Sequence, residues 1–327
     1  MLYRLQMKWQ KYTRSFSGIT LRTFILLLQI ELRWVYNTLM KHGTVLLVGR
    51  PNVGKSTFVN NVIGQKVAIT SPKPQTTRFP IRGLYTEERG QIVFVDTPGI
   101  FGKTKDELSK KINEKTLKAV NQAVDVVVYM VDHTRKRDFE EAKVLGIVRK
   151  IDKPKILVVN KVDMTEYSYL PQYKFLEDEF NYVFSISALK KLHIKPLLAQ
   201  IFDLLPEKAA DKDLETSVYP LLNMDSKTFI AELIREKVFL MMGEEIPYTT
   251  TAVVDEIAER KNGITYIKAR ILTTHDRYKK MLIGAGARKI KELGSYARKE
   301  IALAIGKKVF LDLTVETDPH WQETLYS

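Results

Sequence analysis

The segment from residue 49 to residue 56 constrains this chain more than any other, because it reads Gly-Arg-Pro-Asn-Val-Gly-Lys-Ser. It follows a short apolar run at 44–48 and leads into a helical pattern that begins at Thr57. A glycine-rich turn between a buried strand and a helix lets backbone N–H groups surround phosphate oxygens, and the helix N-terminus adds a favourable field for the anion. The segment is therefore predicted to be a phosphate-binding loop in which Lys55 reaches the β- and γ-phosphates and Ser56 holds Mg²⁺.

Four further apolar runs rich in Val and Ile follow this loop, at 91–95, 125–131, 155–159 and 182–186. They are almost continuous rather than alternating, as in strands that are buried on both faces of a parallel sheet. The repeated order of strand, loop and helix predicts a doubly wound α/β domain. Because ligands of such domains bind at the carboxyl ends of the strands, the loops after these runs are the candidate sites of chemistry.

The tetrapeptide Asp96-Thr97-Pro98-Gly99 stands directly after the run 91–95. A carboxylate at this point can hold Mg²⁺ through water, and the backbone amide of Gly99 can contact a γ-phosphate. Such a tetrapeptide is common in ordinary loops. Its place at the end of a strand next to the phosphate loop favours a role in the same site.

The tetrapeptide Asn160-Lys161-Val162-Asp163 follows the run 155–159 and is predicted to read the base. The Asp163 carboxylate can accept hydrogen bonds from N1–H and the 2-amino group of guanine, which adenine lacks, and an unmatched buried carboxylate is costly. Ser187-Ala188-Leu189-Lys190, after the last run, fits a loop whose Ala188 amide meets guanine O6. The nucleotide is therefore predicted to be GTP rather than ATP.

The composition of the whole chain limits the remaining chemistry. Its 327 residues contain no cysteine, which excludes disulfides, thiolate metal sites and cysteine nucleophiles, and its five histidines have no metal-ligand spacing. The formal net charge is +14, and residues 260–308 alone hold 14 Lys and Arg but only 3 Asp and Glu. This excess favours a polyanionic partner such as nucleic acid or an acidic membrane surface.

A second set of patterns follows a polar, charged stretch at 208–215. It comprises a helix at 227–242, strands at 249–258 and 264–274 joined by Arg260-Lys261-Asn262-Gly263, a short helix at 277–283, a glycine-containing loop, a longer helix and a strand at 309–315. Asn-Gly between two strand patterns is typical of a β-hairpin. The order predicts a smaller α+β domain. Tyr266 and Phe310 could stack on bases, but we expect them to pack in its core.

Residues 1–39 differ from both parts, with 6 Lys and Arg, 1 acidic residue and an apolar run at 23–28. This segment could be an amphipathic helix on a membrane surface or an Arg-rich organellar presequence. Met40 stands immediately before the first strand and would make a natural start. We expect residues 1–41 to be an extension outside the fold.

These motifs in this order resemble the P-loop GTPases, and within them the Era family, in which a GTPase domain is joined to a C-terminal type II KH domain. The resemblance covers about residues 42–322, and its further signatures are Thr70-Ser71-Pro72-Lys73-Pro74-Gln75-Thr76-Thr77-Arg78, Glu232-Leu233-Ile234-Arg235-Glu236-Lys237 and Pro247-Tyr248. It implies a GTPase domain at 42–207, a linker at 208–216 and an RNA-binding KH domain at 217–327.

The resemblance also implies a nucleotide site for GTP and GDP that draws on all four motifs. Its residues are Gly49, Asn52, Val53, Gly54, Lys55, Ser56, Thr57, Asp96, Gly99, Asn160, Lys161, Asp163, Ser187, Ala188 and Leu189. Residues 74–78 would form the first switch. Its Thr77, in preference to Thr76, would join Ser56 and a water-bridged Asp96 on Mg²⁺ when the γ-phosphate is present.

Hydrolysis is expected to be slow, because Ile100 stands where many relatives of the wider class have a water-orienting Gln. The resemblance then leaves catalysis to Lys55, Asn52, Thr77 and Gly99. In relatives with this loop the residue matching Asn52 helps to bind K⁺ between the phosphates, where the ion supplies charge. Asn52 could instead satisfy only its own loop.

The predicted RNA loop departs from the family pattern Gly-x-x-Gly, since it reads Gly284-Ala285-Gly286-Ala287. A Cβ at the last position hinders close approach of the backbone to RNA phosphates. Arg288, Lys289 and Lys291 lie in the first turn of the next helix, where they oppose the helix dipole. Their placement favours phosphate contacts, and with the loop and Arg298 they form the expected RNA-binding set.

The implied function is a GTP-hydrolysing switch that binds the 3′ end of the small-subunit ribosomal RNA and assists maturation of the small ribosomal subunit. The resemblance implies a monomer in the cytoplasm, with peripheral contact at the inner face of the cell membrane as a further feature. Two alternatives stay open on the sequence. One is a membrane-associated GTPase acting through residues 1–39, and the other is an RNA-binding adaptor that holds GTP without hydrolysing it.

Overall fold

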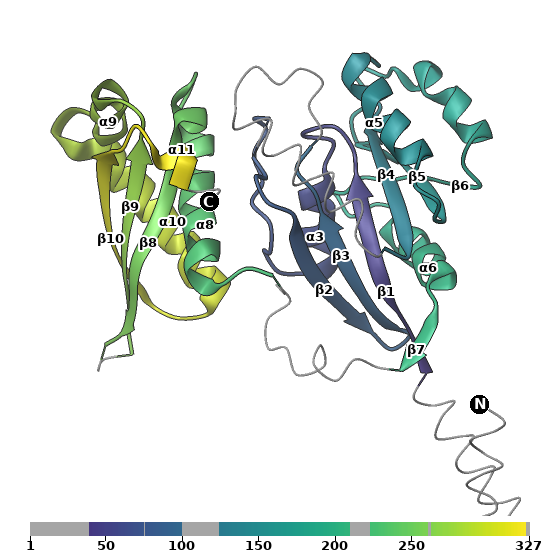
Figure 1. Ribbon diagram of the computed structural model, residues 1–327, viewed down its shortest axis with the longest axis horizontal. Helices are drawn as coiled ribbons and strands as arrows, with labels where there is room; N and C mark the ends of the chain where they lie inside the picture. Colours follow the sequence, from purple (N-terminus) through teal and green to yellow (C-terminus); the bar gives the residue numbers. More distant parts are fainter. Residues whose placement is uncertain (1–38, 75, 100–123, 210–222, 261–262, 325–327) are drawn as a thin grey trace, which may run out of the picture.

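The computed structural model describes residues 39–74, 76–99, 124–209, 223–260 and 263–324, which form two units side by side (Figure 1). The unit drawn in purple to teal is built on a larger sheet, and the unit drawn in green to yellow on a three-stranded sheet. The prediction of a doubly wound α/β unit followed by a smaller α+β unit is confirmed.

The larger sheet has the strand order β2-β3-β1-β4-β5-β6, with β7 paired to β1. Its strands are β1 (Leu39–Val48), β2 (Ile81–Glu87), β3 (Gly90–Asp96), β4 (Val126–Asp132), β5 (Lys155–Asn160), β6 (Tyr182–Ser185) and β7 (Glu207–Ala209). Strands β3, β1, β4, β5 and β6 run parallel, whereas β2 and β7 join antiparallel. All five predicted strands are present, and their carboxyl ends lie at one edge.

Helices cover both faces of this sheet, which explains its continuous apolar runs. Helices α3 (Lys55–Ile63) and α6 (Ile194–Leu204) pack on one face, and α5 (Phe139–Arg149) with the 3-10 turns η1 (Leu170–Gln172) and η2 (Lys174–Asp178) lies on the other. Successive side chains of a strand point to opposite faces. Val45 and Leu47 therefore join the first core, and Leu46 and Val48 the second.

Two strands were not predicted from the apolar runs. Strand β2 is an edge strand, so its side chains alternate between buried and partly exposed, and its pattern is weaker than that of a central strand. Strand β7 is short and includes the first two residues of the predicted linker, 208–216. Residues 39–41 of the predicted extension, 1–41, are not outside the fold, because they form the start of β1 and pair with β7. The rest of the linker, residues 1–38 of the extension and the Ile100 position lie outside the described residues.

The smaller sheet has the order β10-β9-β8, with β8 antiparallel and β10 parallel to β9. Its elements are α8 (Ser226–Met241), η3 (Ile246–Thr249), β8 (Thr250–Glu259), β9 (Thr265–Thr273), α9 (Asp276–Ile283), η4 (Ala285–Ala287), α10 (Arg288–Ile305), β10 (Val309–Thr317) and α11 (Trp321–Thr324). The predicted order of helices and strands is confirmed. The turn of the hairpin, 261–262, lies outside the described residues.

One face of the smaller sheet is covered by α8, α9 and α10, and the core lies there. Ile267, Ala269 and Ile271 of β9 point into this core, so the intervening residues point to the other face. Tyr266 and Phe310 therefore stack on each other there, with ring centroids 6.0 Å apart, and Phe310 is 51% exposed. The expectation that these two rings pack in the core was wrong.

Candidate functional site

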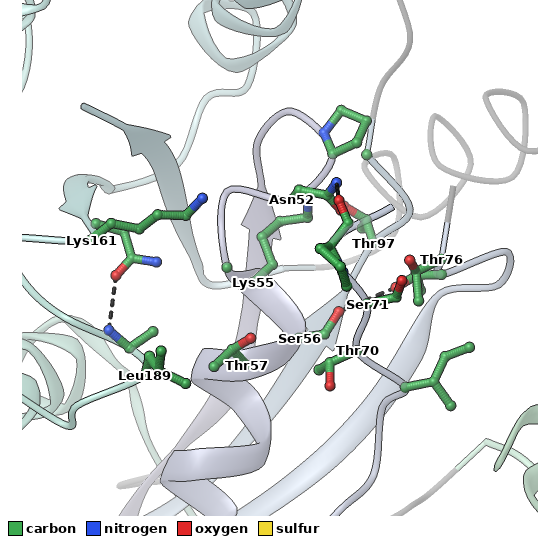
Figure 2. A pocket seen from close by; sticks show the side chains of 18 of the residues that line it. Asn52, Lys55, Ser56, Thr57, Thr70, Ser71, Thr76, Thr97, Lys161 and Leu189 are labelled. Atoms are coloured by element: carbon green, nitrogen blue, oxygen red, sulfur yellow. Dashed lines mark hydrogen bonds between the residues drawn. The ribbon is translucent and has the colours of Figure 1, made fainter. Parts of the chain in front are cut away.

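The four predicted motifs meet around one cavity of about 360 Å³ at the carboxyl edge of the larger sheet. Figure 2 shows Lys161 and Leu189 on one side, Thr70 and Thr76 on the other, and the start of α3 between them. Members of the predicted set that line it include Asn52, Gly54, Lys55, Ser56, Thr57, Gly99, Asn160, Lys161, Asp163, Ala188 and Leu189. The sequence-based grouping of these residues is thus matched by their positions.

Close backbone packing holds the phosphate loop in place. Gly54 has φ +104°, and a Cβ on it would stand 2.2 Å from Nδ2 of Asn160. That Nδ2 donates to the carbonyl of Val53 at 2.7 Å. A Cβ on Gly99 would stand 2.4 Å from the backbone nitrogen of Pro51. The loop therefore fits against the ends of β3 and β5 only with glycine at these positions.

Lys55 is buried, and its ammonium group donates to the carbonyls of Gly49 and Arg50, each at 3.0 Å. Burial lowers the pKa of Lys55 to about 8, although the carboxylates of Asp96 and Glu141 oppose the shift. Burial removes the ammonium group from water, and the surrounding carbonyl dipoles only partly replace that solvation. A bound phosphate would supply the negative charge that stabilises the charged form.

Three oxygen-bearing side chains converge beside Lys55. Ser56 Oγ donates to Oδ2 of Asp96 at 2.5 Å, and the hydroxyls of Ser56 and Thr77 are 3.2 Å apart. Burial raises the pKa of Asp96 to about 6, opposed by Lys55 and by the hydrogen bond from Ser56. Within the described chain, Oδ1 of Asp96 is buried without a hydrogen-bond partner. Hard oxygen donors with one unpaired carboxylate oxygen fit Mg²⁺.

The two threonines of the predicted switch differ in what their hydroxyls do. The Thr76 hydroxyl donates to the carbonyl of Lys73 at 2.7 Å and is thereby used within its own turn. The Thr77 hydroxyl points to Ser56 instead. This geometry supports the preference for Thr77 as the residue that approaches the metal position.

The base-reading motif is held by side chains that the sequence analysis did not single out. Lys161 has φ +70°, and its ammonium pairs with Asp132 at the end of β4 at 2.6 Å. Nε2 of His133 donates to the carbonyl of Lys161 at 3.0 Å. Asp132 and His133 directly follow a predicted strand at the same edge of the sheet. This position in the sequence could have identified them as candidate site residues.

The loop after β6 differs from its prediction in one detail. The amide of Ala188 was expected to meet guanine O6, but it donates to Oδ1 of Asn160 at 2.9 Å. The Asn61 side chain also donates to the Ala188 carbonyl, at 2.6 Å. Guanine O6 would accept a hydrogen bond from this amide only by sharing it, or from the neighbouring amide of Leu189.

Asn52 bridges the phosphate loop and the switch segment. It has φ +64°, and its Nδ2 donates to the carbonyl of Pro72 at 2.6 Å. The amide of Asn52 therefore contacts the segment just before the predicted switch, 74–78, rather than only its own loop. An amide oxygen and a backbone carbonyl are the kind of neutral donors that coordinate a monovalent cation.

The predicted RNA-binding residues lie apart from this cavity, on the smaller unit. Gly284 and Gly286 have φ +69° and +57°, and Ala287 has φ +59°, a left-handed conformation that is strained for a residue with a Cβ. Helix α10 begins directly after this loop. Its cations are exposed to solvent and available to a ligand: Arg288, Lys289, Lys291 and Arg298.

Comparison with known protein families assigns each unit separately. A family model described as a 50S ribosome-binding GTPase matches residues 44–161, and a KH-domain model matches residues 245–322. The first match spans the phosphate loop and reaches the base-reading motif. The second contains the loop from Gly284 to Ala287 and all of α10.

Curated relatives and solved structures match most of the chain at once. The GTPase Era of Halothermothrix orenii is 39% identical over 287 residues, which cover 86% of this chain and 95% of the relative. That of Thermotoga maritima is 39% identical over 293 residues, 87% of this chain and 94% of the relative. A structure of Aquifex aeolicus Era bound to GDP and AlF4⁻ is 31% identical, with a TM-score of 0.79 over 88% of this chain and 97% of that one. An Era structure with MgGDPNP and nucleotides 1506–1542 of 16S ribosomal RNA is 32% identical, with a TM-score of 0.78 over the same shares.

The lowered pKa of Lys55 predicts proton uptake when a nucleoside diphosphate binds. Below pH 8 the ammonium is already charged, whereas above pH 8 a proton must be taken up to form the charged group that pairs with phosphate. Binding of GDP should take up about 0.2 proton at pH 7.5 and about 0.8 at pH 8.5. Calorimetry in two buffers with different ionisation enthalpies measures this number. Equal uptake at both pH values would contradict the assignment to Lys55.

Proposed function

The chain belongs to the GTPase Era family, and we propose that it is a GTP-driven switch that binds the 3′ end of the small-subunit ribosomal RNA and assists maturation of the small ribosomal subunit. The protein is a GTPase, as its relatives and its GTPase-family match show. The proposal adds the RNA partner, the role in subunit maturation and the residues responsible for each.

The observation that carries the proposal is the match to the Era structure that holds both MgGDPNP and nucleotides 1506–1542 of 16S ribosomal RNA. This chain covers 97% of that structure, so the part that binds nucleotide and the part that binds RNA are both represented. The description of the GTPase family model names the large subunit. That model matches only the first unit, whereas the neighbour with RNA matches both, and we therefore favour the small subunit.

The residues of the cavity have separate roles in binding GTP and in its hydrolysis. Asp163 accepts from the guanine ring, the phosphate loop and Lys55 hold the β- and γ-phosphates, and the Gly99 amide contacts the γ-phosphate. When bound, Mg²⁺ would supply positive charge that stabilises the phosphate oxygens. Ser56, Thr77 and a water-bridged Asp96 hold that ion. Thr77 would join the ion only when the γ-phosphate is present, which would make the segment a sensor of GTP.

Asn52 would contribute to catalysis through a monovalent cation. The hydrogen bond from Asn52 to the Pro72 carbonyl brings the side-chain amide and this backbone carbonyl together at the phosphate loop. With its amide oxygen turned inward, Asn52 would help to hold K⁺, which would supply positive charge to the phosphates. Charge so placed would act in the manner of an arginine finger.

The RNA would bind at the loop from Gly284 to Ala287 and along the first turns of α10. Arg288, Lys291 and Arg298 are spaced so that they share one side of this helix, and all are exposed. Exposed cations at the start of a helix are unfavourable unless an anion meets them. Phosphates of a single strand provide that anion.

The membrane alternative depends on residues 1–39, nearly all of which lie outside the described residues. Among the helices that the structure describes, none is long and apolar enough to cross a bilayer. We propose a monomer in the cytoplasm as the working form. Any contact with the inner face of the cell membrane would be peripheral and would depend on the N-terminal extension.

The first prediction concerns the base. Asp163→Asn should weaken GTP binding and favour xanthosine triphosphate, because an amide can donate to the 2-oxo group that replaces the 2-amino group. We expect the preference between the two nucleotides to change by at least tenfold, since a hydrogen bond to a charged group is involved. A competition titration with both nucleotides measures it. Retention of the preference for GTP would refute the role of Asp163.

The second prediction concerns the cation. GTP hydrolysis should be several-fold faster in KCl than in NaCl at equal ionic strength. Asn52→Ala should abolish this difference, while the affinity for GDP stays within about twofold because the phosphate loop keeps its backbone contacts. The measurement is phosphate release in both salts for both proteins. Equal rates of the unchanged protein in the two salts would exclude a catalytic K⁺.

The third prediction tests the RNA partner. An RNA with the small-subunit 3′ end should bind the GTP-loaded protein with a steep salt dependence, because each phosphate contact contributes about −0.7 to the slope of log K against log[salt]. Replacing Arg288 and Lys289 by Ala should flatten the slope by roughly 1–1.5 units. A scrambled RNA of equal length is the control for sequence preference.

Ala287→Gly is the matched variant of the same loop. It should tighten RNA binding with little change in slope, because it admits the RNA backbone and relieves the left-handed strain without adding charge. If the Arg288 and Lys289 double variant keeps both slope and affinity, the start of α10 is only a solvated surface. If the scrambled RNA binds as well as the 3′ end, the proposed partner is wrong.

A further inference from the structure

The segment from Ile69 to Arg78 lies between the two units, and the smaller unit holds it at several points. Ile69 is buried in the core of the smaller unit, although it belongs to the chain of the larger one. The Lys73 ammonium donates to the carbonyls of Phe239 and Met242 at the end of α8. Arg78 lies over the ring of Trp321, 5.2 Å from its centroid, and donates to the Pro247 carbonyl at 3.4 Å.

Arg235 of α8 makes the contact nearest to the chemistry. Its side chain is 1% exposed, and one of its terminal nitrogens donates to the backbone carbonyl of Thr76. The same guanidinium pairs with the Glu232 carboxylate at 2.8 and 2.5 Å and lies over the ring of Phe239. A planar, doubly anchored guanidinium on the face of a buried helix has little freedom to move. The carbonyl of Thr76 is therefore fixed relative to α8.

The next residue is Thr77, whose hydroxyl is 3.2 Å from that of Ser56. The peptide that joins Thr76 to Thr77 is thus held from both sides, by Arg235 through its carbonyl and by the metal-binding side chains through the following hydroxyl. Because a peptide unit is planar, fixing the Thr76 carbonyl limits where the Thr77 side chain can point.

We infer that Arg235 is a positioning residue of the GTPase site, so that the site is complete only when α8 of the KH domain is docked against the switch. This inference rests on the proposed role of Thr77 as the γ-phosphate-dependent ligand of Mg²⁺. Arg235 touches neither nucleotide nor metal. It acts by reducing the conformational freedom that Thr77 loses when GTP and Mg²⁺ bind.

The neighbouring ion cluster joins the same two units but does not reach this peptide. Glu236 is 1% exposed and accepts from Lys66 at 2.6 Å, from Lys237 at 2.9 Å and from the Thr70 amide at 2.8 Å. Glu300 of α10 also accepts from Lys66, at 2.6 Å. Among the described residues, the hydrogen-bond partners of Glu300 are Lys66 and Lys237, and neither belongs to the segment from Thr70 to Thr77. It therefore offers a control that weakens the contact between the units without touching the switch.

The experiment compares full-length variants for GTP hydrolysis, Mg²⁺ requirement and affinity for GDP and for a non-hydrolysable GTP analogue. Arg235→Met keeps the length of the side chain but removes its donors, and Arg235→Lys keeps the charge without the fork. Glu300→Gln is the control variant, and Thr77→Ala reports the proposed role of Thr77 itself. Thermal unfolding shows whether each variant is folded.

Arg235→Met should lower the rate of hydrolysis about tenfold and raise the Mg²⁺ concentration needed for half-maximal rate several-fold. Affinity for the GTP analogue should fall, while affinity for GDP stays within twofold, because GDP does not need the switch threonine. Arg235→Lys should lie between the unchanged protein and Arg235→Met, and it serves alone if Arg235→Met does not fold. Glu300→Gln should stay within twofold on every measure.

Three results would overturn the inference. The first is an unchanged rate and Mg²⁺ requirement in both Arg235 variants while Thr77→Ala changes both, which leaves the proposed role of Thr77 intact. The second is an equal loss of affinity for GDP and the GTP analogue, or an equal effect of Glu300→Gln, which would mean that Arg235 only stabilises the fold. The third is a normal Mg²⁺ requirement in Thr77→Ala, which removes the proposed role of Thr77 as well.

Discussion

The phosphate-binding loop is packed so tightly against the ends of neighbouring strands that no side chain fits at its close approaches. A Cβ on Gly49 would stand 2.4 Å from the carbonyl oxygen of Met130, and one on Gly54 would stand 2.2 Å from the Asn160 side chain. The loop cannot move without moving the ends of β4 and β5. Lys55 is buried as a consequence. Its pKa is lowered to about 8 because burial removes the ammonium group from water, which disfavours the charged form.

The contact between the two units has a different character, because it is made largely by charges. Buried ions are stable only when they are paired and hydrogen-bonded, and removal of one partner leaves the other uncompensated. Glu236 and Arg235 are each 1% exposed. Glu236 accepts a hydrogen bond from the Thr70 amide and Arg235 donates one to the Thr76 carbonyl, both in the segment that carries Thr77. Displacement of the switch would leave these groups short of partners, so the docking of α8 and the position of the switch depend on each other.

The success of the motif-based predictions has a local cause. Glycine at a left-handed φ, a lysine at a helix start and an Asn-Lys-x-Asp sequence after a strand each depend on a few adjacent residues. A continuous apolar run is also a local feature, and such runs predicted the parallel strands. The errors arose where the outcome depends on distant elements. Tyr266 and Phe310 alternate as core residues would, but the described helices α8, α9 and α10 pack on the opposite face of the sheet.

The sequence by itself determined where the glycine-rich loop and the Asn160–Asp163 motif lie, the order of the two units and the excess of cations around the loop from Gly284 to Ala287, since each follows from neighbouring residues and their periodicity. Only the tertiary structure decided which threonine of the switch turns to Ser56, that Asn52 reaches the Pro72 carbonyl, and that Arg235 holds Thr76. These contacts join residues up to 159 positions apart. The first two depend on how separate loops of the larger unit meet, and the third depends on how the two folded units pack. No local pattern of residue types encodes either arrangement.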